Sequence, residues 1–321
     1  ELGRGVKVMW RIPKQIYILI AAVIVLGSLL YQLDHQVDRQ SSPIEDSLLE
    51  AELIMGIPTI PNLGGWPPSL LVALREIHRG FGDQETQAKS LKDLGRLYFI
   101  NGFMGQARQC FDALRKIEPS EARWAYFLGM VTRDYQNKEL AIEAFRESLL
   151  IGQAYPNARY HLGQSYLGSG RILESVDAFG PLLGKNEWAG WAHFGLAKGL
   201  ALEERYVEAL AELDLAIEEM GDVREFYAFL VEVAPYAGRR SGVENARKEL
   251  ERIEYDRDPY DPWFQDLWSL CFDPFRLMLL AKAEELEGDL SKASEILERA
   301  VEIDGEDPEI LEALEALLRR L

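Results

Sequence analysis

The stretch that decides the fold reads LKDLGRLYFINGFMGQARQCF and spans residues 91–111. Two runs with apolar residues at helical spacing flank a short INGFMG break, which predicts two helices joined by a turn. Gly95 lies in the middle of the first run, although a glycine inside a helix costs about 1 kcal/mol relative to alanine. A glycine at this position therefore indicates that close packing outweighs helix propensity.

The same arrangement returns along the chain with a period of 34 residues. Such a period is typical of repeat proteins in which each repeat is one helical hairpin. A small residue on the first helix lets the second helix approach, and an aromatic residue on the second helix fills the adjoining space. The residues that keep the period are Leu94, Leu128 and Leu162; Gly95, Gly129 and Gly163; Ala107, Ala141 and Ser175; and Phe111, Phe145 and Phe179.

This pattern resembles that of the tetratricopeptide repeat family. The family's Leu-Gly-x-x-Tyr motif is present as LGRLY at residues 94–98 and as LGQSY at residues 162–166. In each copy a small residue follows the glycine after twelve positions, and an aromatic residue follows after four more. The resemblance covers roughly residues 86–321, and it implies an all-α solenoid of stacked helical hairpins.

We expect about six repeats and a final capping helix within a solenoid domain of residues 81–321. The fifth repeat is degenerate, because Pro235 is expected to end or kink its first helix. An insertion near residues 255–274 interrupts the period with three prolines and two tryptophans. After it a sixth repeat resumes, and DPEILEALEALLRRL is expected to close the array as a polar-faced capping helix.

An uncharged apolar run, IYILIAAVIVLGSLLYQL, covers residues 16–33. As a helix it reaches about 27 Å, close to the hydrocarbon thickness of a bilayer. We expect a retained transmembrane helix over residues 15–33, with a cleaved signal peptide and a buried core helix as the alternatives. The residues expected to form this anchor are Ile16, Tyr17, Leu19, Val25, Leu30 and Tyr31.

The charges beside this run predict its orientation. Residues 1–14 carry a net charge of +3, and positively charged flanks stay in the cytoplasm. We therefore expect a single-pass protein of the bacterial inner membrane, with the basic flank of residues 1–14 in the cytoplasm and the C-terminal domain in the periplasm. The whole chain carries a net charge of −18, which disfavours nucleic acid as a partner.

Residues 34–80 are predicted to form a periplasmic stalk and pre-repeat segment. The segment begins polar, becomes rich in proline and glycine, and ends in a short helical run. A purely flexible spacer does not need apolar residues, so two interpretations remain: packing onto the edge of the first repeat, or contact with a partner protein at the membrane surface. The apolar residues concerned are Ile57, Ile60, Leu63 and Trp66.

The sequence contains none of the common motifs of catalytic or nucleotide-binding sites. Cys110 and Cys271 fit neither a metal-site spacing nor a CxxC redox motif, so we expect two buried or free thiols. His161 and His193 lie in neighbouring first helices at different repeat positions, which favours ordinary surface or core roles over a metal pair. We therefore expect a protein that is not an enzyme and that has no metal, no cofactor and no small-molecule substrate.

The family resemblance also implies that the first helices line a concave groove. Basic residues gather in its first two repeats although the chain is acidic, which predicts a site for an acidic or carboxylate-ended peptide with aromatic anchors. Two alternatives remain: the basic residues pair with acids of the pre-repeat helix or of the next repeat, or residues 43–80 occupy the groove. The aromatic residues of the insertion are interpreted as core, with an interface as the alternative. The predicted partner-binding residues are Lys89, Lys92, Arg96, Arg123, Tyr126, Arg133, Tyr160, Trp191, Phe194 and Lys198.

These expectations favour a non-catalytic, membrane-anchored scaffold. It would dock to and stabilise partner subunits of a respiratory, photosynthetic or secretion-type membrane complex on the periplasmic face. Its partners would be other proteins, and one helix would contact membrane lipid. The alternative hypothesis is a periplasmic chaperone or biogenesis helper that holds acidic client peptides in the basic groove.

Overall fold

A computed structural model gives the fold, and it describes residues 57–82, 86–133, 137–152, 155–253 and 258–321. All of them belong to one compact unit. The predicted basic flank, the predicted transmembrane helix with its six anchor residues, and the predicted stalk up to residue 56 lie outside the described residues. Within the described ranges, no helix combines the length and apolar content that a membrane span needs.

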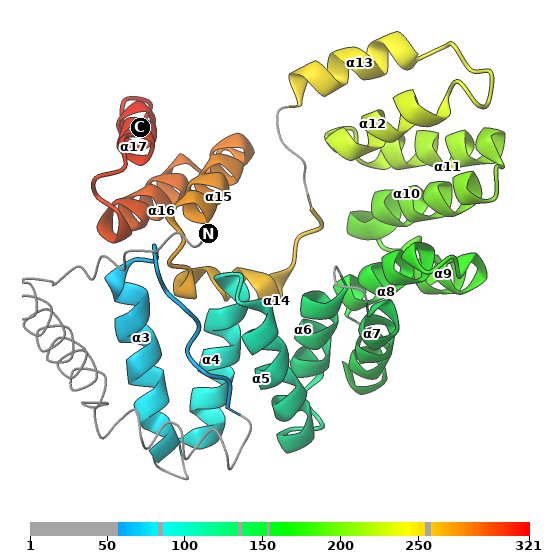
Figure 1. The fold of residues 1–321 in the computed structure, drawn as a ribbon. Coiled ribbons are helices and arrows are strands. Elements are labelled where there is room, and N and C mark those ends of the chain that lie inside the picture. The colour runs from blue at the N-terminus through cyan, green and yellow to red at the C-terminus, as the bar shows by residue number, and fades with distance from the viewer. Residues whose placement is uncertain (1–56, 83–85, 134–136, 153–154, 254–257) are drawn as a thin grey trace, which may run out of the picture. The chain divides into compact units, whose positions relative to one another are not determined.

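Helices arranged as consecutive pairs make up most of the described residues (Figure 1). Each pair packs through its two helices, and neighbouring pairs from α4 to α13 contact one another in chain order. This confirms the expected all-α array of helical hairpins. In the described ranges the pairs are α4 (Gln87–Ile100) with α5 (Met104–Ile117), α6 (Ala122–Thr132) with α7 (Lys138–Gly152), α8 (Pro156–Gly168) with α9 (Ile172–Phe179), α10 (Asn186–Leu202) with α11 (Tyr206–Glu219), α12 (Arg224–Val233) with α13 (Val243–Arg252), and α15 (Pro274–Glu287) with α16 (Leu290–Ile303).

Shorter and flanking elements complete the described part of the chain. Helix α3 (Pro68–Arg79) precedes the first pair, and α17 (Pro308–Leu318) follows the last. Pro235 lies two residues beyond the end of α12, as its missing N–H and fixed φ require. The short elements are η1 (Gly80–Gly82), η2 (Gly180–Leu182), α14 (Pro262–Gln265) and η3 (Trp268–Leu270).

The periodic glycines lie where the two helices of a hairpin are closest. A Cβ atom added to Gly129 would lie 2.5 Å from the ring of Phe145, and one added to Gly163 would lie 2.5 Å from the ring of Phe179. Real Cβ atoms do not approach other atoms this closely, so alanine would push the hairpin apart. The predicted reason for a glycine inside the first helix is therefore confirmed.

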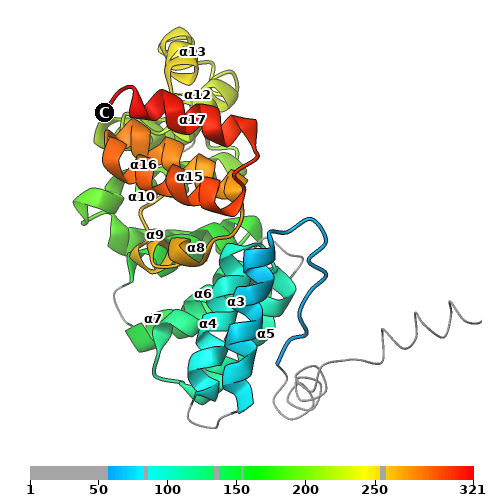
Figure 2. The ribbon, with the colours of Figure 1, turned by 90° about the vertical axis from the view of Figure 1, so that its left-hand side faces the viewer.

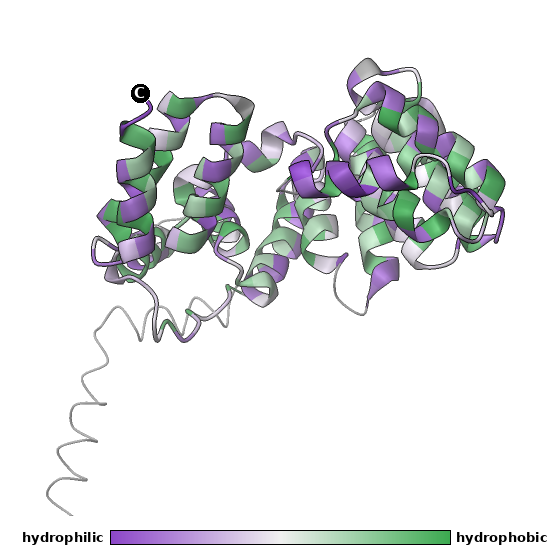
Figure 3. Ribbon diagram, turned by 90° about the horizontal axis from the view of Figure 1, so that it is seen from above, coloured by the Kyte–Doolittle hydropathy of each residue, from purple (hydrophilic) through white to green (hydrophobic). Residues whose placement is uncertain are grey.

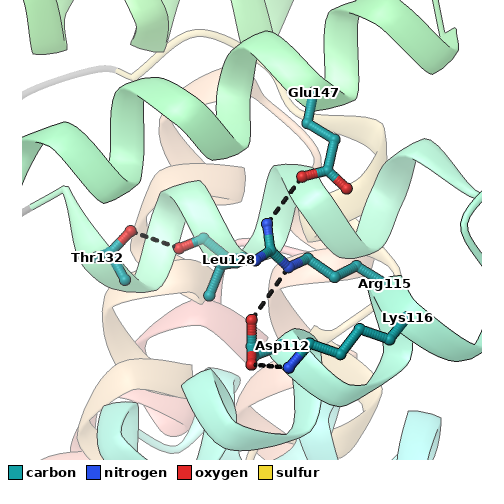
Figure 4. A network of polar contacts seen from close by, with 6 residues as sticks. All are labelled: Asp112, Arg115, Lys116, Leu128, Thr132 and Glu147. Atoms are coloured by element: carbon teal, nitrogen blue, oxygen red, sulfur yellow. Dashed lines mark hydrogen bonds and ion pairs between the residues drawn. The ribbon is translucent and has the colours of Figure 1, made fainter.

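Hydrophobic residues run along one side of most helices and hydrophilic residues along the other (Figure 3). The outer side also carries ion pairs between neighbouring repeats. Arg115 on α5 donates from Nη1 to Glu147 on α7 at 2.8 Å and from Nε to Asp112 at 3.0 Å (Figure 4). These side chains are partly exposed, so each pair contributes about 1 kcal/mol or less, and the buried hairpin contacts provide most of the stability.

The segment before the first repeat packs on it. Helix α3 lies against α4 (Figure 2), and the Trp66 ring lies 4.9 Å from the ring of Phe103 in the turn before α5. Ile57 is buried, and Ile60 and Leu63 are half-buried. Packing onto the edge of the first repeat therefore explains why an apolar residue is present at Trp66. Contact of these four residues with a partner stays a prediction.

His78 on α3 is buried, and neither of its ring nitrogens has a hydrogen-bond partner among the described residues. Burial lowers the pKa of His78 from 6.5 to about 4. Because the folded state disfavours the charged form, this contribution to stability is present above pH 6.5 and is lost as the pH falls towards 4.

We expect His78→Leu to lessen the loss of stability on acidification. Between pH 7 and pH 4.5, the free energy of unfolding should fall by roughly 2 kcal/mol less in the variant than in the unchanged chain. Urea unfolding at the two pH values measures this difference. An equal fall in both proteins would show that His78 does not titrate on unfolding.

The sixth pair does not simply continue the stack of the first five. The main helix contacts of α15 are with α16 and α17, and Arg299 on α16 donates to the carbonyl oxygens of Trp268 and Cys271 at 2.9 Å each. The exposed side of α17 carries Glu309, Glu312 and Glu315, in line with the polar face expected of a capping helix, and it also exposes Leu311 and Leu318.

Candidate partner-binding site

Residues 258–272, here called the strap, lie against the first helices of the first three repeats. Its η3 turn contacts α4, and its polar groups reach Tyr126 on α6 and Asn157 on α8. In Figure 1, α14 lies beside α4 and α6. The insertion of the same chain thus lies in the groove. The alternative occupant, residues 43–80, falls partly outside the described residues and stays a prediction.

Asp261 holds the centre of the strap. Its Oδ2 accepts a hydrogen bond from the Tyr126 hydroxyl at 2.5 Å, and its Oδ1 accepts from the Tyr155 hydroxyl. The same Oδ1 caps α14 by accepting from the backbone N–H groups of Trp263 and Phe264 at 3.0 and 3.1 Å. Asp261 is only 9% exposed, and these four donors offset the cost of burying its charge.

The two tyrosines are kept as donors by their surroundings. Burial, reinforced by the charge of Asp261 and the hydrogen bond to it, raises the pKa of Tyr126 well above 10. Burial and the hydrogen bond to Asp261 raise the pKa of Tyr155 in the same way. Both hydroxyls therefore stay protonated over the neutral pH range.

Two asparagine side chains hold the backbone of the strap. Asn157 Nδ2 donates to the carbonyl oxygen of Tyr260 at 2.9 Å. Asn101 Nδ2 donates to the carbonyl oxygen of Leu270 at 2.8 Å, and its Oδ1 accepts from the N–H of Phe272 at 2.6 Å. These bonds recognise peptide groups, so they do not depend on the side chains of the strap.

Aromatic packing completes the contact. Trp263 stacks on Tyr155 with ring centroids 3.6 Å apart and an angle of 17° between the ring planes. Phe264 meets Phe99 on α4 edge to face, with centroids 5.5 Å apart. Ring pairs of this kind contribute about 0.5–1.5 kcal/mol beyond the area they bury. Trp263 and Phe264 are thus half-buried against the repeats, which fits the interpretation as core in part, while Phe275 is 60% exposed.

The predicted aromatic anchors are not exposed. Tyr126 lies beneath the strap, and Tyr160, Trp191 and Phe194 are buried among neighbouring helices. Repeat position predicted that they face the groove, but large apolar rings there are covered by the next repeat or by the strap. They are not available as open anchors in this conformation, and their role in binding a partner stays a prediction.

Most of the predicted basic residues have acidic or polar partners within the chain, and one of these pairs, Lys198 with Glu225, joins a base to an acid of the next repeat as one alternative held. Lys92 pairs with Glu118 at 2.6 Å, and Arg123 pairs with Glu121 at 2.9 Å. These pairs neutralise the expected basic groove. The other contacts are Arg96 to the Asp266 carbonyl at 3.4 Å, Arg133 to His161 at 2.9 Å and Lys198 to Glu225 at 3.3 Å, while Lys89 is exposed.

Sulfur and imidazole groups give no sign of a metal centre in the part of the chain that the structure describes. Cys110 and Cys271 are free, buried thiols, as expected. His193 pairs with Glu212 at 2.7 Å, while His161 contacts Arg133. Among the described residues, no group of three or more His, Cys, Asp or Glu side chains is placed to hold a metal ion.

An open cleft of about 720 Å³ lies between the start of α10, the turn after α11 and the start of the strap. Four of its lining residues carry carboxylates, so the cleft is strongly acidic. Tyr260 on the strap is 70% exposed at its wall. The lining residues are Glu187, Trp191, Glu219, Met220, Gly221, Asp222, Asp258 and Tyr260.

Sequence reasoning missed this cleft and the centre of the strap. Asp261 does carry a local signal, because an aspartate followed by a proline is a common start of a helix. Its tyrosine partners lie 135 and 106 positions away, and no local pattern relates them to it. The cleft acids come from two helix ends and a turn, which the repeat positions do not include.

Comparison with known proteins supports the repeat architecture. Profiles described as tetratricopeptide repeat match residues 92–159 and residues 274–317. A tetratricopeptide repeat protein from Parabacteroides merdae ATCC 43184 is 15% identical, with a TM-score of 0.50 over 86% of this chain and 100% of that chain. MamA from Desulfovibrio magneticus RS-1 is 12% identical, with a TM-score of 0.45 over 52% of this chain and 92% of that chain. A search of curated proteins gave no match.

At 15% identity the Parabacteroides merdae structure shows the fold alone. The two matched segments hold the first repeats and the last one, and the helix pairs between them keep the same hairpin packing. Both matches are to a repeat that typically serves protein–protein interaction. The chain is therefore a tetratricopeptide repeat protein.

Proposed function

We propose that this protein is a non-catalytic, membrane-anchored scaffold that holds a protein partner in the cleft beside its fourth repeat. The observation that carries the proposal is the cleft itself, which is open and combines four carboxylates with the exposed ring of Tyr260. Stacked repeats present extended surfaces of this kind to partner chains. The partner contact therefore lies outside the face that the strap covers.

The chemistry of the cleft selects a basic segment. Glu187 and Glu219 accept hydrogen bonds from ammonium or guanidinium groups, and the exposed ring of Tyr260 can stack on a cation. An acidic segment would meet like charge there, which costs several kcal/mol in an interface. The proposed partner thus presents lysine or arginine side chains to the cleft.

The membrane placement rests on the sequence. The apolar run of residues 16–33 and the basic residues 1–14 support a single-pass inner-membrane protein with its repeats in the periplasm. A partner held there would be a subunit of a respiratory, photosynthetic or secretion-type membrane complex. The alternative, a helper for acidic clients, is less well supported, because Lys92 and Arg123 already pair with Glu118 and Glu121.

Affinity purification of the full chain in mild detergent tests the scaffold. The double variant Glu187→Lys/Glu219→Lys should reduce the amount of co-purified partner by about tenfold or more. Glu218→Lys is the matched control, because Glu218 is exposed on α11 beside Glu219 but does not line the cleft. Equal recovery of the partner with the double variant, or a chain that purifies alone, would contradict the proposal.

Protease added to intact spheroplasts tests the placement separately. The repeat domain should be degraded from outside, while inverted inner-membrane vesicles should protect it. The opposite pattern would place the repeats in the cytoplasm.

A further inference from the structure

We infer that the face beneath the strap is a peptide-binding site for protein segments in which an acidic residue precedes two aromatic residues. The strap is the chain's own occupant, and it keeps this site closed. The inference goes beyond the proposed scaffold function, because the site shares no residue with the helix walls of the acidic cleft. The residues that form the face are Arg96, Phe99, Asn101, Tyr126, Tyr155 and Asn157.

The face recognises the strap as a protein recognises a bound peptide. Asn101 and Asn157 contact three backbone groups of the strap, at 2.6–2.9 Å, through side chains that project from the array. Contacts of this kind hold any extended segment, whatever its sequence. The face would therefore keep its donors and acceptors for a second segment if the strap left.

Sequence preference comes from one carboxylate and two rings. The hydroxyls of Tyr126 and Tyr155 converge on Asp261, and Trp263 and Phe264 pack on Tyr155 and Phe99. A residue without a side-chain acceptor in place of the aspartate would leave the buried Tyr126 hydroxyl without a partner, which disfavours such segments.

The edge of the site is a small pocket of mixed charge. Its volume is about 160 Å³, and it lies where the strap meets Lys92, Arg96 and Arg123, with Trp263 and Asp266 of the strap on its other side. These basic groups pair with acids that line the same pocket. The edge therefore adds no charge preference, and the selectivity of the face comes from the carboxylate and the two rings.

The strap can leave without breaking a repeat. It contains only the four residues of α14 and the three of η3 as regular structure. Its contacts with the face are made by its own side chains and by the backbone groups that Asn101 and Asn157 hold.

The hairpins beneath have their own buried cores around Phe111 and Phe145. Exchange of one segment for another therefore breaks no helix pair. It does cost the contacts with the face, the two bonds from Arg299 and the burial of Leu267 and Cys271.

A peptide-binding assay on the full chain tests the inference. The strap variant Asp261→Ala/Trp263→Ala should bind a fluorescein-labelled peptide of residues 258–272 about tenfold or more tightly than the unchanged chain, because its site is more often free. The same peptide with both substitutions is the matched control and should not bind. A folded strap variant that gains no binding would overturn the inference.

Hydrogen exchange gives a second measurement that needs no variant. Excess peptide should speed exchange of the strap amides of Phe264 and Phe272, which Asp261 and Asn101 protect, by about tenfold or more, and should leave the amides of α6 unchanged. Unchanged exchange in the strap would overturn the inference. If a tagged unchanged chain captured the strap variant, the occupant of the site would be the strap of a second copy. That result would overturn the inference that each chain closes its own site.

These outcomes are distinct from those of the scaffold test. The strap variant keeps Glu187 and Glu219, which the scaffold test replaces. Loss of the cleft partner therefore reports on those two glutamates, whereas failure of the peptide assay reports on the face beneath the strap.

Discussion

Replacing Phe179 with alanine is expected to lower the free energy of unfolding by about 3–5 kcal/mol. The ring is 0% exposed at the end of α9, between Gly163 on α8 and Gly195 on α10. A Cβ atom on either glycine would lie 2.5 Å from the ring, so the ring fills the space between two repeats completely. Urea unfolding followed by far-ultraviolet circular dichroism measures the loss.

Two controls separate packing from helix propensity. Leu173→Ala on the same helix removes a side chain that is 78% exposed, and it should change stability by no more than about 0.5 kcal/mol. Gly195→Ala should cost about 1–3 kcal/mol in the unchanged chain. In the Phe179→Ala chain it should cost almost nothing, because the methyl group enters the cavity. An equal cost of Gly195→Ala in both chains would contradict this packing.

Replacing Asp261 with alanine is expected to lower the free energy of unfolding by about 2–4 kcal/mol. Four donors lose their acceptor, and the Tyr126 hydroxyl is left buried without a partner. The cap of α14 is lost with them. Urea unfolding measures this effect as well.

The control for this prediction is Asp258→Ala, because Asp258 is an exposed acid at the start of the same strap. It should change stability by no more than about 0.5 kcal/mol. A loss below about 1 kcal/mol for Asp261→Ala would mean that the strap contributes little to the fold.

The hairpins were predictable because their determinants repeat within short distances. Gly129 and Phe145 are separated by 16 positions, and the same pair recurs one period later as Gly163 and Phe179. Because this contact joins nearby residues and recurs every 34 positions, it can be recognised in a single sequence. The fold class and the reason for the helical glycines therefore follow from the sequence alone.

The state of the candidate site was not predictable in the same way. Repeat position gave the helix face on which Lys92, Arg96 and Tyr126 lie, but not what covers that face. The strap lies outside the period, and its central contact joins Tyr126 to Asp261 across 135 positions. Contacts between a repeat and an insertion have no register, so only the three-dimensional arrangement reveals that the groove is occupied.

A double-mutant cycle between Tyr126 and Asp261 tests the strap contact most directly. The cycle compares Tyr126→Phe, Asp261→Ala and the combined variant by urea unfolding. A coupling free energy of about 1–3 kcal/mol is predicted, because the two groups share one buried hydrogen bond. Losses that add within about 0.5 kcal/mol would contradict the placement of the strap on the first three repeats.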